Sequence, residues 1–169
     1  MAYTFLDQVI GVDAPTVTGT DRLWHLGQEA AAADSALGMA KFVYVKGSNA
    51  GQGALCAYGG FTASVMSAAL SDSHLPLGIA AGNLSSTNRY GWVQVEGIVS
   101  NAWGTNHDIA AGKPLYLHAV AGKMGSAVVT GNFIAGAYAH VSGSSDSNAA
   151  SSLSVQIRYP YVPGSTSGF

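Results

Sequence analysis

Residues 41–47, Lys-Phe-Val-Tyr-Val-Lys-Gly, place their side chains alternately on two faces, with a period of two, and end at a glycine. Related short runs recur at residues 91–97, 113–118 and 154–159, and Gly, Ser and Asn separate them. Short alternating runs with such punctuation are typical of half-buried β-strands. This repeated pattern restricts the chain to a compact body built of strands.

The fold class that follows is all-β: a small β-sandwich or barrel, tulip-like in outline, with an extended N-terminal arm and at most one short helix. Glycines fall mainly between the runs or at their ends, where positive φ angles and bulges are needed. The one short helix is expected at residues 67–72. The expected strands span residues 42–45, 53–58, 62–66, 77–81, 90–100, 115–119, 127–130, 133–141 and 152–161.

The chain divides into three expected parts. Residues 1–40 form an extended arm, residues 41–161 form the β body, and residues 162–169 form a C-terminal tail. The arm is expected to make few core contacts of its own, so its apolar side chains need a neighbouring surface. The alternative is that residues 1–40 add edge strands to the same body. The expected interface residues are Phe5, Leu6, Val9, Ile10, Leu23 and Trp24 of the arm, with Tyr159 and Tyr161 near the end of the body.

Charge is scarce in this chain, and this limits its partners. Charged residues make up 9% of the sequence and the formal net charge is −2, whereas about 25% charged residues is usual for a globular domain. Little repulsion between copies favours an oligomer or a larger assembly; the alternative is a secreted, low-charge monomer. The 7 Lys and Arg residues are scattered along the chain and cannot form a basic stripe. We therefore expect no nucleic-acid partner.

Membrane insertion and disulfide bonding are not expected either. No run approaches the roughly 18 apolar residues that span a membrane, and the N-terminus lacks the features of a signal peptide. Cys56 is the only cysteine, so no internal disulfide can form. We expect no membrane partner, and synthesis in a reducing cytoplasm.

No catalytic, cofactor-binding or metal-binding motif occurs in the sequence. The histidines lack the spacing of a zinc site, and there is no Gly-x-Ser-x-Gly elbow. The glycines at residues 51–53 and 59–60 are not followed by the helix and lysine of a phosphate-binding loop. We therefore expect a protein that is not an enzyme and that binds no cofactor or metal.

The aromatic residues leave two interpretations open. One is a sugar-stacking face. The other, which is more common, is anchoring of the core and of interfaces. The residues concerned are Trp24, Trp92, Trp103, Tyr90, Tyr159 and Tyr161.

Several short phrases occur together in this chain in a characteristic order. Leu-Gly-Gln at residues 26–28 is followed by a glycine-containing turn and by Phe-Val-Tyr-Val-Lys-Gly at residues 42–47. Pro-Leu-Gly-Ile-Ala at residues 76–80, Tyr-Gly-Trp-Val-Gln-Val-Glu-Gly at 90–97 and Ala-Ala-Gly-Lys-Pro-Leu-Tyr-Leu at 110–117 follow. In these pieces the chain resembles the head decoration, or cement, proteins of tailed phages and allied small virion structural proteins. The serine-rich stretch after residue 141 and the tail depart from that pattern.

The resemblance implies an all-β, often trimeric protein that sits over junctions between major capsid subunits and stabilises the phage head. The implied partners are the major capsid protein and further copies of the chain, as a homotrimer. The implied location is the outer surface of the capsid, after synthesis in the host cytoplasm. The family has no catalytic residues to transfer. The alternative function is that of a phage head or tail fibre adhesion module or a carbohydrate-binding module.

Overall fold

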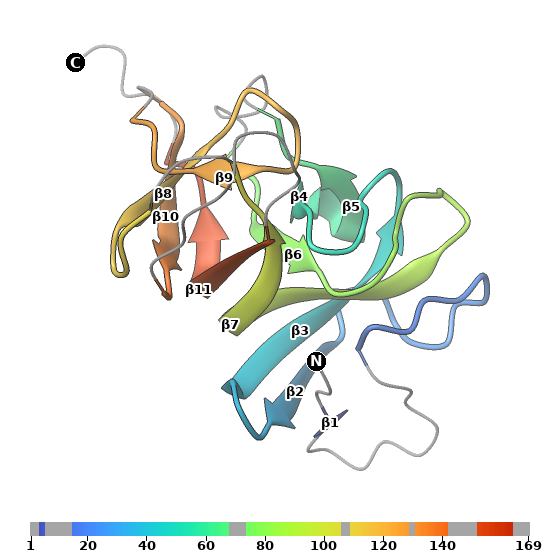
Figure 1. Ribbon diagram of the computed structural model, residues 1–169. Coiled ribbons are helices and arrows are strands. Elements are labelled where there is room, and N and C mark those ends of the chain that lie inside the picture. The colour runs from blue at the N-terminus through green and yellow to red at the C-terminus, as the bar shows by residue number, and fades with distance from the viewer. Residues whose placement is uncertain are drawn as a thin grey trace.

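The computed structural model describes residues 4–5, 15–67, 74–105, 109–128, 131–141 and 152–163, with the backbone alone at residues 4–5. Figure 1 shows that strands make up nearly all of its regular structure, which confirms the all-β expectation. The eleven strands of this part are β1 (Thr4–Phe5), β2 (Glu29–Asp34), β3 (Gly38–Gly47), β4 (Leu55–Ala57), β5 (Thr62–Val65), β6 (Leu77–Ala80), β7 (Tyr90–Trp103), β8 (Pro114–Leu117), β9 (Met124–Gly125), β10 (Phe133–Ala139) and β11 (Ser152–Tyr161). A 3-10 turn spans Gly59–Phe61, and the described residues contain no α-helix. Residues 68–72 of the expected helix lie outside this description.

Five of the strands close into a small barrel. β3 pairs in parallel with β5, and β5 pairs antiparallel with β4. β4 then pairs with β6, β6 with β7, and β7 returns to β3, all antiparallel. Alternate side chains of these strands point inward and fill the barrel, as in other small barrels. The cluster that they form includes Val43, Val45, Cys56, Ala63, Ala80, Val93 and Val95.

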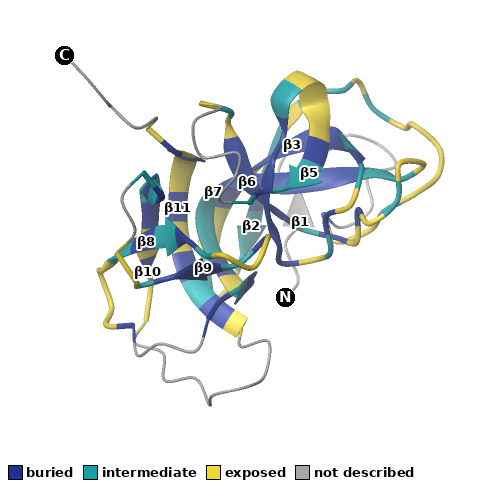
Figure 2. Ribbon diagram, turned by 90° about the horizontal axis from the view of Figure 1, so that it is seen from above, coloured by how far each residue is buried: buried dark blue, intermediate teal, exposed yellow. Residues whose placement is uncertain are grey.

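The second half of β7 begins another layer. There β7 pairs with β11, and β10, β8 and β9 follow in that order. Figure 2 shows buried positions recurring along β11, whose inward side chains pack toward the barrel. Barrel and second layer share one hydrophobic cluster, which includes Leu55, Ile79, Leu115, Ile134 and Ile157. The two layers therefore form one body around a common core.

From residue 29 onward, the segment expected as an arm belongs to the sheet. β2 and β3 form a hairpin in which Asp34 opposes Gly38, and Asp34 Oδ1 accepts hydrogen bonds from the amides of Ala36 and Leu37. The boundary expected between residues 40 and 41 therefore falls inside β3. β1 adds a further edge strand, whose pairing partner is β2. These strands match the alternative interpretation, in which this part of the chain extends the same sheet.

Other strands lie close to their expected positions, with one exception. Residues 127–128 of the strand expected at 127–130 are not in a strand, and residues 129–130 are not described. Val128 is 78% exposed, and no described strand pairs with residues 127–128. The short strand β9 lies just before them, where Met124 is fully buried. At the other end of the body, Val162 of the expected tail is buried in the shared cluster.

A bulge just before Gly97 marks the point where β7 passes from one layer to the other. Lys41 faces Glu96 and Phe42 faces Gln94, so Val95 is the extra residue of β7. Gly97 follows with a φ of +104°, which residues with a side chain rarely adopt. The side chain of Gln94 is 3% exposed and fixes the bulge from within. Its Nε2 donates to Glu96 O at 3.2 Å and to Ile98 O at 3.1 Å. These bonds hold the carbonyls on either side of Gly97, so the bend is specified by two residues.

We expect Gly97→Ala to lower the free energy of unfolding by about 3 kcal/mol, because backbone strain and a collision act together. A Cβ at this position would lie 2.6 Å from Met39 O and 2.9 Å from the Ala40 Cβ. Gly38→Ala is the matched control, since its φ is +77° but nothing lies within 4 Å of its Cβ position. It is expected to cost about 1 kcal/mol. Urea denaturation measures both, and equal losses would contradict the close packing at the bulge.

Candidate functional site

The outer face of β3 and β7 carries a hollow of about 110 Å³, which we call the aromatic hollow. Tyr44 and Trp92 are direct partners in the β3–β7 register, and Tyr90, two residues before Trp92, points to the same face. The Tyr44 ring stacks on that of Tyr90, with centroids 6.4 Å apart, and meets the edge of Trp92 at 5.0 Å. The lining residues are Val17, Gly19, Leu23, Trp24, Tyr44, Tyr90 and Trp92.

The segment before β2 forms the rim of this hollow and is tied to the strands. Gly19 and Tyr90 exchange two backbone hydrogen bonds, of 3.1 and 2.8 Å. The Leu23 amide donates to the Tyr44 hydroxyl at 3.3 Å, and backbone bonds join residues 27–28 to Tyr44. The pKa of Tyr44 is raised above its ordinary value, mainly because the side chain is buried, and the hydrogen bond from Leu23 offsets part of this increase. The hydroxyl therefore stays protonated near neutral pH and can both donate and accept.

A second and more open hollow, of about 380 Å³, adjoins the first. Leu23 and Trp24 line both hollows, and Arg22, His25 and Gln28 complete the second. Arg22 Nε donates to Trp24 O at 3.1 Å, which holds the guanidinium at the rim. Polar side chains thus border the aromatic rings on one side.

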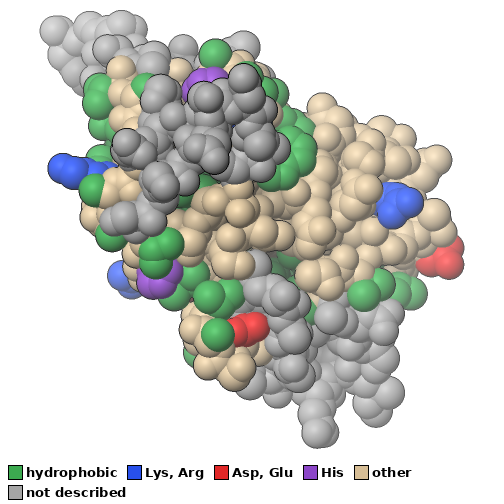
Figure 3. Space-filling model, in the orientation of Figure 1, with side chains coloured by type: hydrophobic (Ala, Val, Ile, Leu, Met, Phe, Trp, Pro, Cys, Tyr) green, Lys and Arg blue, Asp and Glu red, His purple; other side chains and the backbone are tan. Residues whose placement is uncertain are grey.

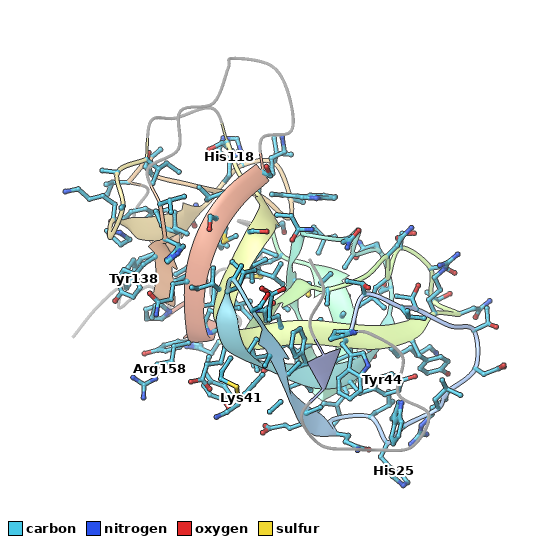
Figure 4. All side chains as sticks on the ribbon, turned by 60° about the horizontal axis from the view of Figure 1, so that its bottom comes forward. His25, Lys41, Tyr44, His118, Tyr138 and Arg158 are labelled. Atoms are coloured by element: carbon cyan, nitrogen blue, oxygen red, sulfur yellow. The ribbon has the colours of Figure 1, made fainter. Side chains whose placement is uncertain are left out.

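Tyr159 lies apart from the aromatic hollow, beside a charged pair. Lys41 Nζ is 2.9 Å from Glu96 Oε2, donates to the Tyr159 hydroxyl at 3.4 Å, and lies 5.5 Å from the centre of that ring. The hydrogen bond to Glu96 is the main cause that raises the pKa of Lys41. In Figure 4, Lys41 lies apart from Tyr44 and His25, which are both at the end of the molecule that carries the hollows.

Four of the eight expected interface residues lie within the first ten residues of the chain. Phe5 is in β1, and its backbone pairs with that of Ala32. Leu6, Val9 and Ile10 lie outside the described residues. Their contacts with a neighbour stay a prediction.

The other four expected interface residues separate into two pairs. Leu23, which is 65% exposed, and the half-buried Trp24 meet in the aromatic hollow, where Trp24 packs against the body of its own chain. Tyr159 and Tyr161 are 42% and 49% exposed near the end of β11. The structure thus brings Leu23 and Trp24 into a cavity and leaves the two tyrosines on the surface.

The aromatic residues considered for sugar stacking separate in the same way. Trp103, Tyr159 and Tyr161 do not line the aromatic hollow; Trp103 lies so close to Gly51 and Gly53 that Cβ atoms there would collide with its ring. The three that do line it are Trp24, Tyr90 and Trp92.

Sequence reasoning missed three residues that line the hollow, Val17, Gly19 and Tyr44, and Tyr44 is the aromatic one among them. The available signal was its alternation with valines in the first alternating run, which places Phe42 and Tyr44 on one face of a strand. Tyr90 and Trp92 have the same spacing in a later run. Only the pairing of the two strands shows that these faces meet.

Cys56 has no role as a nucleophile in this structure. Its side chain is fully buried in the barrel, and its Sγ donates to Gly78 O at 3.3 Å. Burial raises the pKa of the thiol to about 12, and the thiolate is the reactive form.

Within the described ranges, no group of three or more His, Cys, Asp or Glu residues is placed to hold a metal ion. The same ranges include no helix long and apolar enough to cross a membrane.

Comparison with known proteins adds no family to these observations. No protein-family model, curated protein or solved structure matches the chain. What the protein does is therefore inferred from its own sequence and geometry.

Burial of Cys56 predicts a loss of stability at alkaline pH. The pKa of this thiol is 9.0 when exposed and about 12 in the fold, so the unfolded chain loses the proton first as the pH rises. The stabilisation is complete below pH 9 and falls by about 1.4 kcal/mol per pH unit above it. Urea denaturation at pH 8 and pH 10 should show this loss, and Cys56→Ala should remove most of it. An unchanged loss in that variant would contradict the assignment.

Proposed function

We propose that the protein is a non-enzymatic structural protein of a phage head, a decoration or cement protein that binds the outer surface of the capsid over junctions between major capsid subunits. The observation that best supports this proposal is a weakly charged, all-β surface on which large apolar side chains are exposed. The resemblance of several short phrases to those of cement proteins favours the same role. In the part of the chain that is described, the exposed large apolar residues are Val17, Leu23, Met39, Phe61, Val120, Val128, Tyr138, Val141, Tyr159 and Tyr161.

Weak charge suits a protein that lies among many identical copies. On the face that Figure 3 shows, few charged side chains are visible among the polar and apolar ones. Because the net charge is only −2, repulsion between copies is small and does not oppose apolar contacts. Single exposed apolar residues are ordinary on protein surfaces. Their combination with scarce charge is what favours a partner surface.

The end of β11 offers two anchors for such a contact. Tyrosine is enriched in interfaces because its ring buries a large area while its hydroxyl keeps a polar partner. Tyr159 is oriented by its contact with Lys41, and the backbone of Tyr161 pairs with Pro76 and Ala135. Side chains on such a fixed backbone lose less entropy on docking than side chains on a free loop.

We propose further copies of the chain, in a homotrimer, as the second partner. Linked copies bind a repeating shell more tightly than one copy does, because each later contact is intramolecular. Weak contacts at each subunit then suffice for stable attachment. Nothing in the charge distribution favours nucleic acid as a partner.

Replacing Tyr161 with serine is expected to weaken attachment to heads, because one anchor at the end of β11 is lost. Expanded phage heads that lack the protein are mixed with the purified wild type or Tyr161→Ser. Bound copies are counted by mass spectrometry against the major capsid protein. We expect the wild type to saturate at a fixed ratio and the Kd of the variant to rise about tenfold.

Tyr138→Ser is the matched control, because Tyr138 has a similar exposure, 44%, but lies on β10 and is not one of the two proposed anchors at the end of β11. It should bind like the wild type. Failure of the wild type to bind heads contradicts the proposed function, and equal binding of the two variants contradicts the role of Tyr161. Sedimentation of the purified protein in the same experiment tests the homotrimer, which a monomer would contradict.

A further inference from the structure

We propose that the aromatic hollow, together with the open hollow beside it, is a binding site for a neutral sugar ring of the pyranose class. The capsid role does not imply such a site, and the site does not depend on that role. Three features support the assignment: the rings, the polar rim and the charge of the lining.

The rings offer flat apolar faces on which the C–H groups of a pyranose can stack. Trp24 and Tyr90 are partly buried and are the rings that a ligand can reach, whereas Tyr44 and Trp92, which are 3% and 4% exposed, support them from behind. A pyranose has an apolar face of C–H groups and a periphery of hydroxyls, so it needs both kinds of contact. Cavities lined by aromatic side chains with a few polar groups are typical of small-molecule sites.

The rim of the open hollow supplies partners for the hydroxyls. Arg22, His25 and Gln28 line it, and Arg22 and His25 are exposed. These groups can donate to or accept from neutral hydroxyls. A site with such groups discriminates against ligands that lack the hydroxyls, because its polar atoms would lose their partners.

The charge of the lining argues for a neutral ligand. Aromatic cages also bind quaternary ammonium ions, but no carboxylate is among the described residues that line the two hollows. Arg22 is the only permanently charged side chain in that lining and repels a cation. A single guanidinium at an exposed rim is also a weak site for a phosphate, which is usually held by several donors.

Hydrogen bonds hold the rim of the site in place. The backbone bonds between Gly19 and Tyr90 and the bond from Leu23 to the Tyr44 hydroxyl fix the rim against the strands. A fixed rim reduces the entropy lost on binding. The open hollow, of about 380 Å³, is within the size range of small-molecule sites, and the aromatic hollow, of about 110 Å³, adds only a smaller recess beside it.

The test presents the full-length protein with a panel of neutral methyl pyranosides, N-acetylhexosamines and short oligosaccharides. Saturation-transfer NMR detects binding, and tryptophan fluorescence gives the Kd, since Trp24 and Trp92 line the hollow. We expect at least one sugar to bind and Trp24→Ala to raise its Kd about tenfold. Arg22→Ala should also weaken binding measurably. Because Arg22 is exposed, this second variant keeps the test decisive if Trp24→Ala fails to fold.

Tyr138→Ser serves again as the control and should keep the wild-type Kd. Three results would overturn the proposal. The first is no binding by any member of the panel. The second is binding that Trp24→Ala and Arg22→Ala leave unchanged. The third is displacement of the sugar by choline at equal concentration, which would identify the hollow as a cage for cations.

Discussion

A single strand, β7, belongs to both layers of the body, and the bend that it makes at Gly97 is the constraint on which the rest of the structure depends. Before the bend, β7 closes the barrel by pairing with β3 and β6; after it, β7 pairs with β11. The glycine permits the positive φ, and the buried Gln94 side chain holds the carbonyls on either side. A straight β7 could not contribute side chains to the hydrophobic clusters of both layers, because all of its inward side chains would face the same layer.

The same strand positions the candidate sites on different halves of one body. Its first half places Tyr90 and Trp92 beside Tyr44 on the outer face of the barrel, where they line the aromatic hollow. Its second half pairs with β11, which carries Tyr159 and Tyr161 to the surface. If the protein attaches to the capsid through the end of β11, as we propose, the aromatic hollow lies on the other half of the body and stays available to a sugar.

Strand positions could be predicted from the sequence, because alternating side chains and glycines depend on the local backbone geometry. β11, for example, spans the expected residues 152–161. Pairing could not be predicted, since Tyr44 and Trp92 meet only through the β3–β7 register. The bulge was hidden for the same reason: residues 90–100 read as one uninterrupted strand, and only the close approach of Met39 O shows why Gly97 must be glycine. The alanines of β2 follow one another without the alternation of apolar and polar residues that indicates a strand, so the sequence predicted this segment as part of an arm.

Hydrogen–deuterium exchange of the intact chain, followed by mass spectrometry, tests most directly whether β7 unites the two layers. The structure predicts that peptides on either side of Gly97 exchange at the same slow rate, together with β3 and β11, because they open only when the whole body unfolds. The segment at residues 15–28, which is tied by fewer bonds, should exchange faster. Fast exchange throughout β8, β10 and β11 while the barrel stays protected would show two independent units and contradict the account.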